Sequence, residues 1–157
     1  MPRAPYQILA LPFRKVRPGE FEFAVLKRSD NGHWQGVAGG GEDDESPDQA
    51  AQRETQEETG LDSTCLIYAL EAEAIVPVHC FAARKIWPKD LTHIPEHCFA
   101  VDATGAEIVL SDEHTESRWL DYDDAARLFT YDSNRAALKE LRDRLRSNQL
   151  DSRKTTE

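Results

Sequence analysis

Apolar runs separated by turn residues predict a series of β-strands in the first third of the chain. Two such runs, Tyr6–Val16 and Phe21–Lys27, flank Arg17-Pro18-Gly19-Glu20, whose proline and glycine favour a hairpin turn. A second turn-forming stretch, Ser29–Gly32, precedes a short apolar segment, Trp34–Val37. We therefore expect an N-terminal hairpin followed by a third, shorter strand.

The next element is a helix whose two ends are both marked in the sequence. Ser46 is a good N-cap, Pro47 suits the first helical position, and Gln49 completes a Ser-x-x-Gln capping box. Gly60 stands where a left-handed residue ends a helix. The glycines at 39–41, just before this helix, predict a flexible loop.

The remaining pattern predicts further strands and then two helices. The expected strands are Thr64–Tyr68, Ala72–Ala82, His97–Val101, Ile108–Leu110 and Ser117–Leu120. The expected helices cover about Tyr122–Phe129 and a segment after Asp132 or Ser133 in which Leu138, Leu141 and Leu145 recur at helical spacing. We infer one mixed α/β (α+β) domain over residues 1–146, with a polar, frayed tail over 147–157.

Composition narrows the class of protein. The chain has 157 residues and a net charge of −10, which disfavours non-specific binding to a nucleic acid polymer or an anionic membrane. No apolar stretch approaches the ~20 residues of a membrane span, and the N-terminus lacks the apolar core of a signal peptide. The irregular spacing of Cys65, Cys80 and Cys98 is typical of reduced core cysteines, so we expect a cytoplasmic protein.

Three carboxylates share one side of the predicted helix. At about 100° per residue, Glu54 and Glu58 lie about 40° apart, and Glu57 lies about 60° from Glu54 on the other side. The small residues Ala50 and Ala51 lie on that same side. The opposite side is expected to be polar, and consists of Asp48, Gln52, Thr55, Gln56 and Thr59. Because like charges packed this closely repel, the arrangement favours a bound hard cation, Mg²⁺ or Mn²⁺.

The same segment resembles the Nudix box, the signature of a family of pyrophosphate-cleaving hydrolases. The positions that match the box are Gly39, Glu45, Arg53, Glu54, Glu57, Glu58, Gly60 and Leu61. Thr55 departs from the aliphatic residue usual there, and Asp44 stands where many members have glycine; neither position carries a metal ligand. The resemblance implies a mixed β-sheet sandwiched between helices.

The resemblance also implies roles for the box residues. Glu54 and Glu58 would be the main metal ligands, assisted by Glu57 and the carbonyl of Gly39. Arg53 and Glu45 would form an ion pair that holds the carboxylates in register, the alternative for Arg53 being an exposed helix charge. A divalent ion held there would screen a phosphorylated substrate and promote attack by water.

Outside the box the chain resembles the subgroup that hydrolyses dihydroneopterin triphosphate or dATP. The matching pieces are Trp34-Gln35, Leu26-Lys27-Arg28, Ile108-Val109, Glu113-His114, Trp119-Leu120-Asp121 and Ser133-Asn134-Arg135. By this resemblance Glu113 completes the metal site or acts as the general base, the alternative being a solvated loop acid. His114 is expected to be its hydrogen-bonding neighbour rather than a ligand.

The subgroup further implies a set of substrate-binding residues. Arg3 and Arg28 match positions that contact phosphates, although surface arginines are the common alternative. Trp34 either stacks on a pterin or purine ring or belongs to the core. Tyr131 is expected to line the pocket, and Ala38 stands where a polar residue is usual, which removes one possible hydrogen bond to substrate.

Three functions therefore remain open on sequence grounds. The favoured one is hydrolysis of a nucleoside or pterin triphosphate to the monophosphate and pyrophosphate. A second is hydrolysis of another nucleoside diphosphate derivative, such as ADP-ribose or a dinucleoside polyphosphate. A non-catalytic Nudix module that binds nucleotides or a partner protein is disfavoured because all the box carboxylates are present. The expected partner is a small phosphorylated molecule, and the sequence leaves monomer and homodimer open.

Overall fold

A mixed β-sheet forms the centre of the molecule. The computed structural model describes residues 3–42, 44–81 and 85–150. In that part of the chain the strands are β1 (Arg3–Arg17), β2 (Glu20–Arg28), β3 (Trp34–Gln35), β4 (Val37–Glu42), β5 (Ile67–Pro77), β6 (His93–Asp102) and β7 (His114–Leu120). The helices are α1 (Pro47–Thr59), the short 3₁₀ turn Val78–Cys80, α2 (Tyr122–Leu128) and α3 (Asp132–Ser147).

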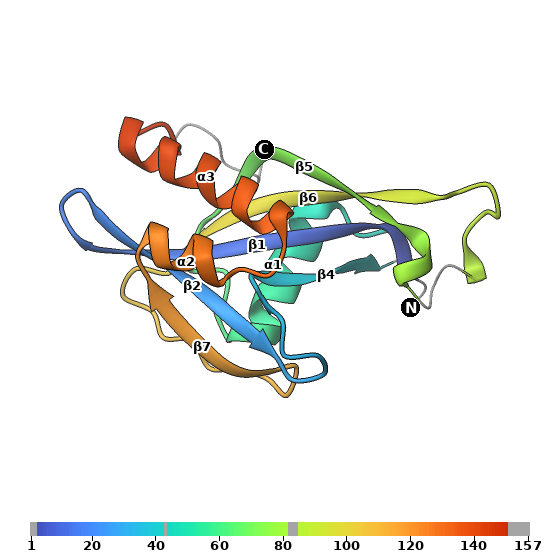
Figure 1. Cartoon of the computed structure of the whole chain (residues 1–157), viewed down its shortest axis with the longest axis horizontal. Helices are drawn as coiled ribbons and strands as arrows, with labels where there is room; N and C mark the ends of the chain where they lie inside the picture. The colour runs from blue at the N-terminus through green and yellow to red at the C-terminus, as the bar shows by residue number, and fades with distance from the viewer. Residues whose placement is uncertain (1–2, 43, 82–84, 151–157) are drawn as a thin grey trace.

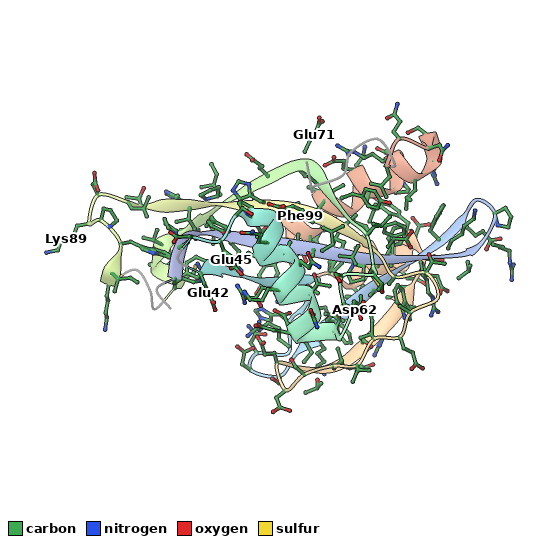
Figure 2. All side chains as sticks on the ribbon, turned by 180° about the vertical axis from the view of Figure 1, so that it is seen from behind. Glu42, Glu45, Asp62, Glu71, Lys89 and Phe99 are labelled. Atoms are coloured by element: carbon green, nitrogen blue, oxygen red, sulfur yellow. The ribbon has the colours of Figure 1, made fainter. Side chains whose placement is uncertain are left out.

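The sheet is covered on both faces, which confirms the expected helix–sheet–helix sandwich. Helices α2 and α3 lie on one face and α1 on the other, as the two opposite views show (Figure 1, Figure 2). Each face buries its own apolar cluster. Leu9 and Leu11 of β1 pack with Leu138 and Leu141 of α3, whereas Ile8 and Ala10 pack with the α1 alanines. Alternate side chains of β1 thus belong to the cores on opposite faces of the sheet.

Strand β1 is the central strand because it pairs with three others. Its first half pairs antiparallel with β4 and parallel with β6, and its second half forms the predicted hairpin with β2. Residues from Ile8 to Leu11 are therefore buried on both sides, which explains why they read as a continuous apolar run. The two strands expected at the N-terminus are confirmed.

Helix α1 begins and ends where its sequence predicts. Ser46 and Gln49 form the reciprocal capping box, and Gly60 ends the helix at φ 74°. The far side of the helix is polar, as expected, but two of its residues, Thr55 and Thr59, are buried. The Thr59 hydroxyl donates to the Thr55 carbonyl at 2.6 Å, which satisfies that polar group without water.

The glycines at 39–41 were expected to form a flexible loop, and this expectation is wrong. They lie in β4, where Gly39 pairs with Ile8 and Gly40 with Gln7 of β1. A Cβ atom would meet the Glu54 carboxylate at Gly39, the Arg3 guanidinium at Gly40 and the Tyr6 hydroxyl at Gly41. Lack of space, rather than a need for unusual backbone angles, therefore explains the three glycines.

The expected strand Ile108–Leu110 is also wrong. Its backbone bonds to the end of α1 instead: the N–H of Val109 donates to the Thr59 carbonyl at 2.8 Å, and that of Ser111 to the Glu58 carbonyl at 3.3 Å. These two carbonyls have no partner within the helix, so the segment caps α1 rather than extending the sheet.

The two strands expected at Thr64–Tyr68 and Ala72–Ala82 form a single strand, β5, with an irregularity between Ala69 and Glu73. It begins only at Ile67, because Asp62 accepts hydrogen bonds from the N–H and hydroxyl of Thr64 and holds a turn there. Ala82 lies outside the described residues.

The expected strands His97–Val101 and Ser117–Leu120 fall within β6 and β7, and both C-terminal helices are present.

The end of the described chain and the cysteines differ in part from expectation. Leu150 is buried in the α3-side core, so the tail expected from residue 147 is packed at that position. Cys98 is buried as expected, but Cys80 is exposed; both are free thiols. In the part of the chain that the structure describes, no helix is long and apolar enough to cross a membrane.

Candidate active site

Two carboxylates of α1 face the sheet. The Glu54 carboxyl carbon lies 2.3 Å from where a Cβ on Gly39 would stand, so this side chain rests directly on β4. One turn later, the Glu58 side chain is fully buried, and neither of its carboxylate oxygens has a hydrogen-bond partner. Glu54 is 12% exposed. The pair thus forms a concentration of oxygen ligands between α1 and the bare backbone of β4.

The environment of this pair disfavours negative charge. Burial raises the pKa of Glu58, and the neighbouring Glu54 carboxylate raises it further. Burial also raises the pKa of Glu54, an effect that Arg53 partly opposes. A cation placed between the two would reverse both effects, because an opposite charge nearby stabilises the ionised form.

Arg53 organises the other acids at this end of α1. Its Nε donates to Glu45 Oε2 at 2.7 Å and its second amino group to Glu45 Oε1 at 3.0 Å, which is the expected ion pair. The same guanidinium bonds to the Gly40 carbonyl at 2.8 Å and to Glu54 at 3.1 Å. Only 22% of the side chain is exposed, so Arg53 ties helix, loop and strand together rather than being a free surface charge.

Glu57 differs from its two neighbours. Its side chain is 53% exposed and contacts Arg53 at 3.3 Å. It therefore lies outside the buried pair, on the Arg53 side of the helix.

His114 and Glu113 approach from the start of β7. The His114 ring is fully buried with Nδ1 3.8 Å from Glu58 Oε1, and neither ring nitrogen has a hydrogen-bond partner. The hydrogen bond expected between His114 and Glu113 is therefore absent, and the separation from Glu58 is also too long for one. Burial lowers the pKa of His114 to about 4, helped by the charge of Arg28, so the imidazole is neutral.

Glu113 is exposed, but its loop is anchored beside the pair. The N–H of Ser29 donates to the Glu113 carbonyl at 2.9 Å, and the Ser29 hydroxyl donates to the Asp112 carbonyl at 2.8 Å. The Glu113 charge is close enough to raise the pKa of Glu58 and to act on Arg28.

The two arginines expected to bind phosphates lie at different sides of the pair. Arg28 is bonded to Asp30 by two hydrogen bonds of 2.9 and 3.0 Å and feels the charges of Glu58 and Glu113. Arg3 covers Gly40 and feels the charge of Glu54. Burial lowers the pKa of Arg3, whose guanidinium also lies 5.0 Å from the Phe81 ring centroid.

The other three residues expected at the substrate site, Trp34, Tyr131 and Ala38, lie on the other face of the sheet. Trp34 packs partly against the α3-side core, with the Arg118 guanidinium 4.8 Å from its ring centroid. Tyr131 is exposed and its hydroxyl lies 2.5 Å from Nδ1 of His33. Ala38 pairs with Leu9, so it faces the α3 side whereas its neighbour Gly39 faces α1. The structure therefore does not bring these three into the carboxylate cluster.

The donor set fits a hard divalent ion, although the acids are not gathered into a closed cage. Within residues 3–42, 44–81 and 85–150, no three His, Cys, Asp or Glu side chains stand close enough together to hold a metal ion. Glu54 and Glu58 supply carboxylate oxygens, and those of Glu58 are buried without partners. Such oxygens are the ligands that Mg²⁺ prefers, and this ion usually binds to one or two carboxylates together with substrate phosphates. The residues present thus fit the expected ion.

The sequence pattern did not point to the buried neutral His114 or to a second buried acid, Glu96 of β6. A His beside an acidic loop and a Glu within a strand are ordinary in sequence. Only the packing shows that their polar atoms are enclosed.

Known proteins are similar to this chain in sequence and in fold. The profile of the NUDIX domain matches residues 14–141. The asymmetrical bis(5'-nucleosyl)-tetraphosphatase of Rattus norvegicus is 35% identical over 127 residues, covering 80% of this chain and 82% of the relative. The dihydroneopterin triphosphate diphosphatase of Escherichia coli K12 is 29% identical over 119 residues, covering 74% and 79%.

Solved structures agree with this relationship. A NUDIX hydrolase from Listeria monocytogenes is 40% identical with a TM-score of 0.84, covering 94% of this chain and 98% of its own. The E. coli dihydroneopterin triphosphate pyrophosphohydrolase is 26% identical with a TM-score of 0.70, covering 88% and 95%. The chain belongs to the NUDIX domain family, and it is a hydrolase of phosphoric anhydride bonds.

Proposed function

We propose that this protein hydrolyses a nucleoside or pterin triphosphate to the monophosphate and pyrophosphate, with Mg²⁺ or Mn²⁺ as cofactor. One observation carries the proposal. The buried Glu54–Glu58 pair lies against Gly39, the two Glu58 oxygens have no partner, and Arg3 and Arg28 flank the pair. A polyphosphate needs positive charge on several sides, and a divalent ion with two arginines supplies it.

The box residues would hold the ion, as in a family that generally uses divalent metals. Glu54, Glu58 and the Gly39 carbonyl would be the main ligands, and Glu57 and Glu113 would contribute from the exposed side of the pair. An ion held there would neutralise phosphate charge and favour attack by water on phosphorus. Arg53 keeps Glu54 in position, because the same guanidinium is fixed by Glu45 and by the Gly40 carbonyl.

Glu113 is the group proposed to take the proton of the attacking water. Its exposure leaves the carboxylate open to solvent, and its anchored loop keeps it near Glu58 and Arg28. A positioned carboxylate of this kind lowers the barrier by accepting a proton as the water oxygen bonds to phosphorus. The two arginines bind the phosphate oxygens and hold the chain of phosphates in line. Because the Arg3 guanidinium is already partly buried, its binding to phosphate loses little freedom.

A second candidate is the asymmetrical hydrolysis of a dinucleoside tetraphosphate to a mono- and a triphosphate. The observation that favours it is the 35% identity to the rat enzyme that bears this name, which exceeds the 29% identity to the E. coli pterin enzyme. Both reactions break a phosphoric anhydride bond, so the carboxylate site serves either.

The experiment that separates them is a substrate panel with Mg²⁺ in which products are resolved chromatographically. Dihydroneopterin triphosphate, dATP, diadenosine tetraphosphate and ADP-ribose are compared by kcat/KM. Pyrophosphate and a monophosphate from the first two support the proposal. Preferential formation of ATP and AMP from the tetraphosphate would support the second candidate, and preferential release of AMP from ADP-ribose would contradict both.

A further inference from the structure

Glu96 of β6 is a buried acid that the hydrolytic mechanism does not use. It is 7% exposed, and its Oε1 is enclosed without a hydrogen-bond partner. Ser133, in the first turn of α3, lies close enough to the carboxyl group to lower its pKa. Glu96 therefore lies between the sheet and the N-terminal turn of α3, on the face opposite to α1.

The sheet register places Glu96 in a polar row. Gly40 of β4 pairs with Gln7 of β1, and Gln7 pairs with Glu96 of β6. Residues paired across neighbouring strands point to the same face, so the side chains of Gln7 and Glu96 are adjacent. Arg3 begins the row, because its guanidinium covers Gly40 and donates to Gln7 Oε1 at 2.5 Å. The row thus runs from Arg3 through Gln7 to Glu96.

The two ends of this row have different surroundings. Arg3 feels the charge of Glu54 and belongs to the phosphate end of the site. Two strand spacings separate Gly40 from Glu96, which is about 10 Å and comparable to the span from a nucleotide's first phosphate to the far edge of its base. Ala38 and the turn before α3 border the same face.

The enclosed Glu96 oxygen lowers the stability of the folded protein unless a ligand hydrogen-bonds to it. In the described chain, Glu96 has no ion-pair partner within 4 Å, and the guanidinium of Arg3 is bonded to Gln7 and to backbone carbonyls. Burial raises the pKa of Glu96, an effect that the nearby Ser133 only partly offsets. An enclosed polar atom without a partner destabilises the folded protein, and strand pairing does not require an acid at this position.

We propose that Glu96 is a specificity-determining residue whose free oxygen accepts a hydrogen bond from the exocyclic amino group of a purine or pterin ring. The inference rests on the proposed function, since it takes the ring from a nucleotide or pterin whose phosphates lie between Arg3 and the α1 carboxylates. Adenine, guanine and pterin all carry such an amino group. A ring that lacks it leaves the carboxyl oxygen unpaired, and this loss provides discrimination.

Binding of matched nucleoside monophosphates tests the inference without any turnover, because these molecules contain no anhydride bond. AMP is compared with purine riboside monophosphate, and GMP with IMP; each pair differs by one amino group. Calorimetric titration should show that the wild type binds the amino member of at least one pair about tenfold more tightly or better. In E96L that ratio should fall to about one, with unchanged affinity for the ring that lacks the amine. E96Q keeps one acceptor oxygen and should keep part of the preference.

The matched control is E73Q on the neighbouring strand β5, where the Glu73 side chain is 63% exposed and pairs with His97. This variant should bind as the wild type does. Thermal unfolding provides an independent measurement: E96L should be at least as stable as the wild type, because it removes an unpaired buried acid.

Equal wild-type affinities within both pairs, or a ratio that survives in E96L, would overturn the inference. A clear drop in the melting temperature of both Glu96 variants, with the ratio retained, would assign Glu96 a structural role instead. The outcome is separable from that of the proposed function. A protein that prefers the amino ring through Glu96 but hydrolyses no triphosphate refutes only the reaction, and an active triphosphatase without this preference refutes only the role of Glu96.

Discussion

Two glutamates of the same box, Glu45 and Glu58, are held in opposite ways. Glu45 accepts two hydrogen bonds from Arg53 and one from the backbone N–H of Glu42, and these bonds lower its pKa. Glu58 is fully buried beside Glu54 and a neutral His114, and its pKa is raised. One carboxylate is supplied with positive charge by the protein, and the other is deprived of it.

This difference separates structural from functional acids. An acid whose partners are built in stabilises the local fold, and here it fixes the loop before α1. An acid that is enclosed without a cation destabilises the protein until a ligand brings the charge, so its presence indicates a binding role. Spacing in the sequence places both acids in one motif, but only their surroundings distinguish the two roles.

The largest effect is expected for E58Q, which tests whether the buried acid is a metal ligand. We expect kcat/KM to fall by roughly 10³-fold or more, since a neutral amide is a poor ligand for Mg²⁺. Metal-free stability should be unchanged or higher, because the unpaired buried acid is removed. Steady-state kinetics and thermal unfolding measure the two effects. E116Q, an exposed acid on β7 that pairs with Arg118, is the control. Near-normal activity in E58Q would show that the buried pair is not the metal site.

Glu113 extends the same reasoning to the proposed base. In E113Q, kcat should fall by about 10² to 10⁴, the usual contribution of a general base, while the fold is retained. Steady-state kinetics measure this change, and an unchanged kcat would show that Glu113 is a solvated loop acid.

R53K tests whether the ion pair between Arg53 and Glu45 stabilises the local fold. Lysine keeps the charge but cannot reproduce the paired bonds to Glu45 together with those to Gly40 and Glu54. We expect stability to fall by about 1–3 kcal/mol and kcat/KM by about 10- to 100-fold, as Glu54 loses its support. Denaturant unfolding and kinetics report these separately. A variant that loses activity at full stability would place Arg53 in contact with substrate instead.

The last two predictions concern the pH dependence of metal-free stability, in which no activity is measured. Because the folded pKa of Glu58 lies above its ordinary 4.5, the folded protein retains a proton that the unfolded chain releases, so this group makes stability fall as pH rises above 4.5. Unfolding curves of E58Q should therefore diverge upward from the wild type with rising pH, by up to about 1.4 kcal/mol per pH unit.

His114 acts with the opposite sign. Its folded pKa of about 4 lies below the ordinary 6.5, so the unfolded chain binds a proton that the folded protein does not, and stability falls as pH drops from 6.5 toward 4. H114Q should gain on the wild type only in that window, by up to about 1.4 kcal/mol per pH unit. Parallel curves for either variant and the wild type would show that the group titrates normally.

Local signals explain what could be predicted from the sequence. The capping box at Ser46, the terminal Gly60 and the Arg53–Glu45 pair depend on residues close in the chain, and all three are present. The strand runs of β1 and β2 were recognisable because they are long and apolar. The sandwich followed from the resemblance rather than from these signals.

The features that were predicted wrongly from the sequence depend on contacts between distant parts of the chain. Ile108–Leu110 has the composition of a strand, but its N–H groups bond to the end of α1. Thr55 and Thr59 are polar residues on the side of α1 away from the acids, yet both are buried. Glu96 and His114 are enclosed because segments distant in the chain pack around them. The spacing of residues within one segment cannot predict such packing.

The three consecutive glycines of β4 have a consequence for how this site tolerates change. Alternate residues of a strand face opposite sides, so adding one methyl group displaces the Glu54 carboxylate at Gly39 but the Arg3 guanidinium at Gly40. At Gly41 it displaces Tyr6, whose hydroxyl bonds to the Glu45 carbonyl at 2.7 Å. Neighbouring positions in the chain therefore report on separate parts of the site. A run of glycines that looks permissive in sequence is among the least substitutable segments of this molecule.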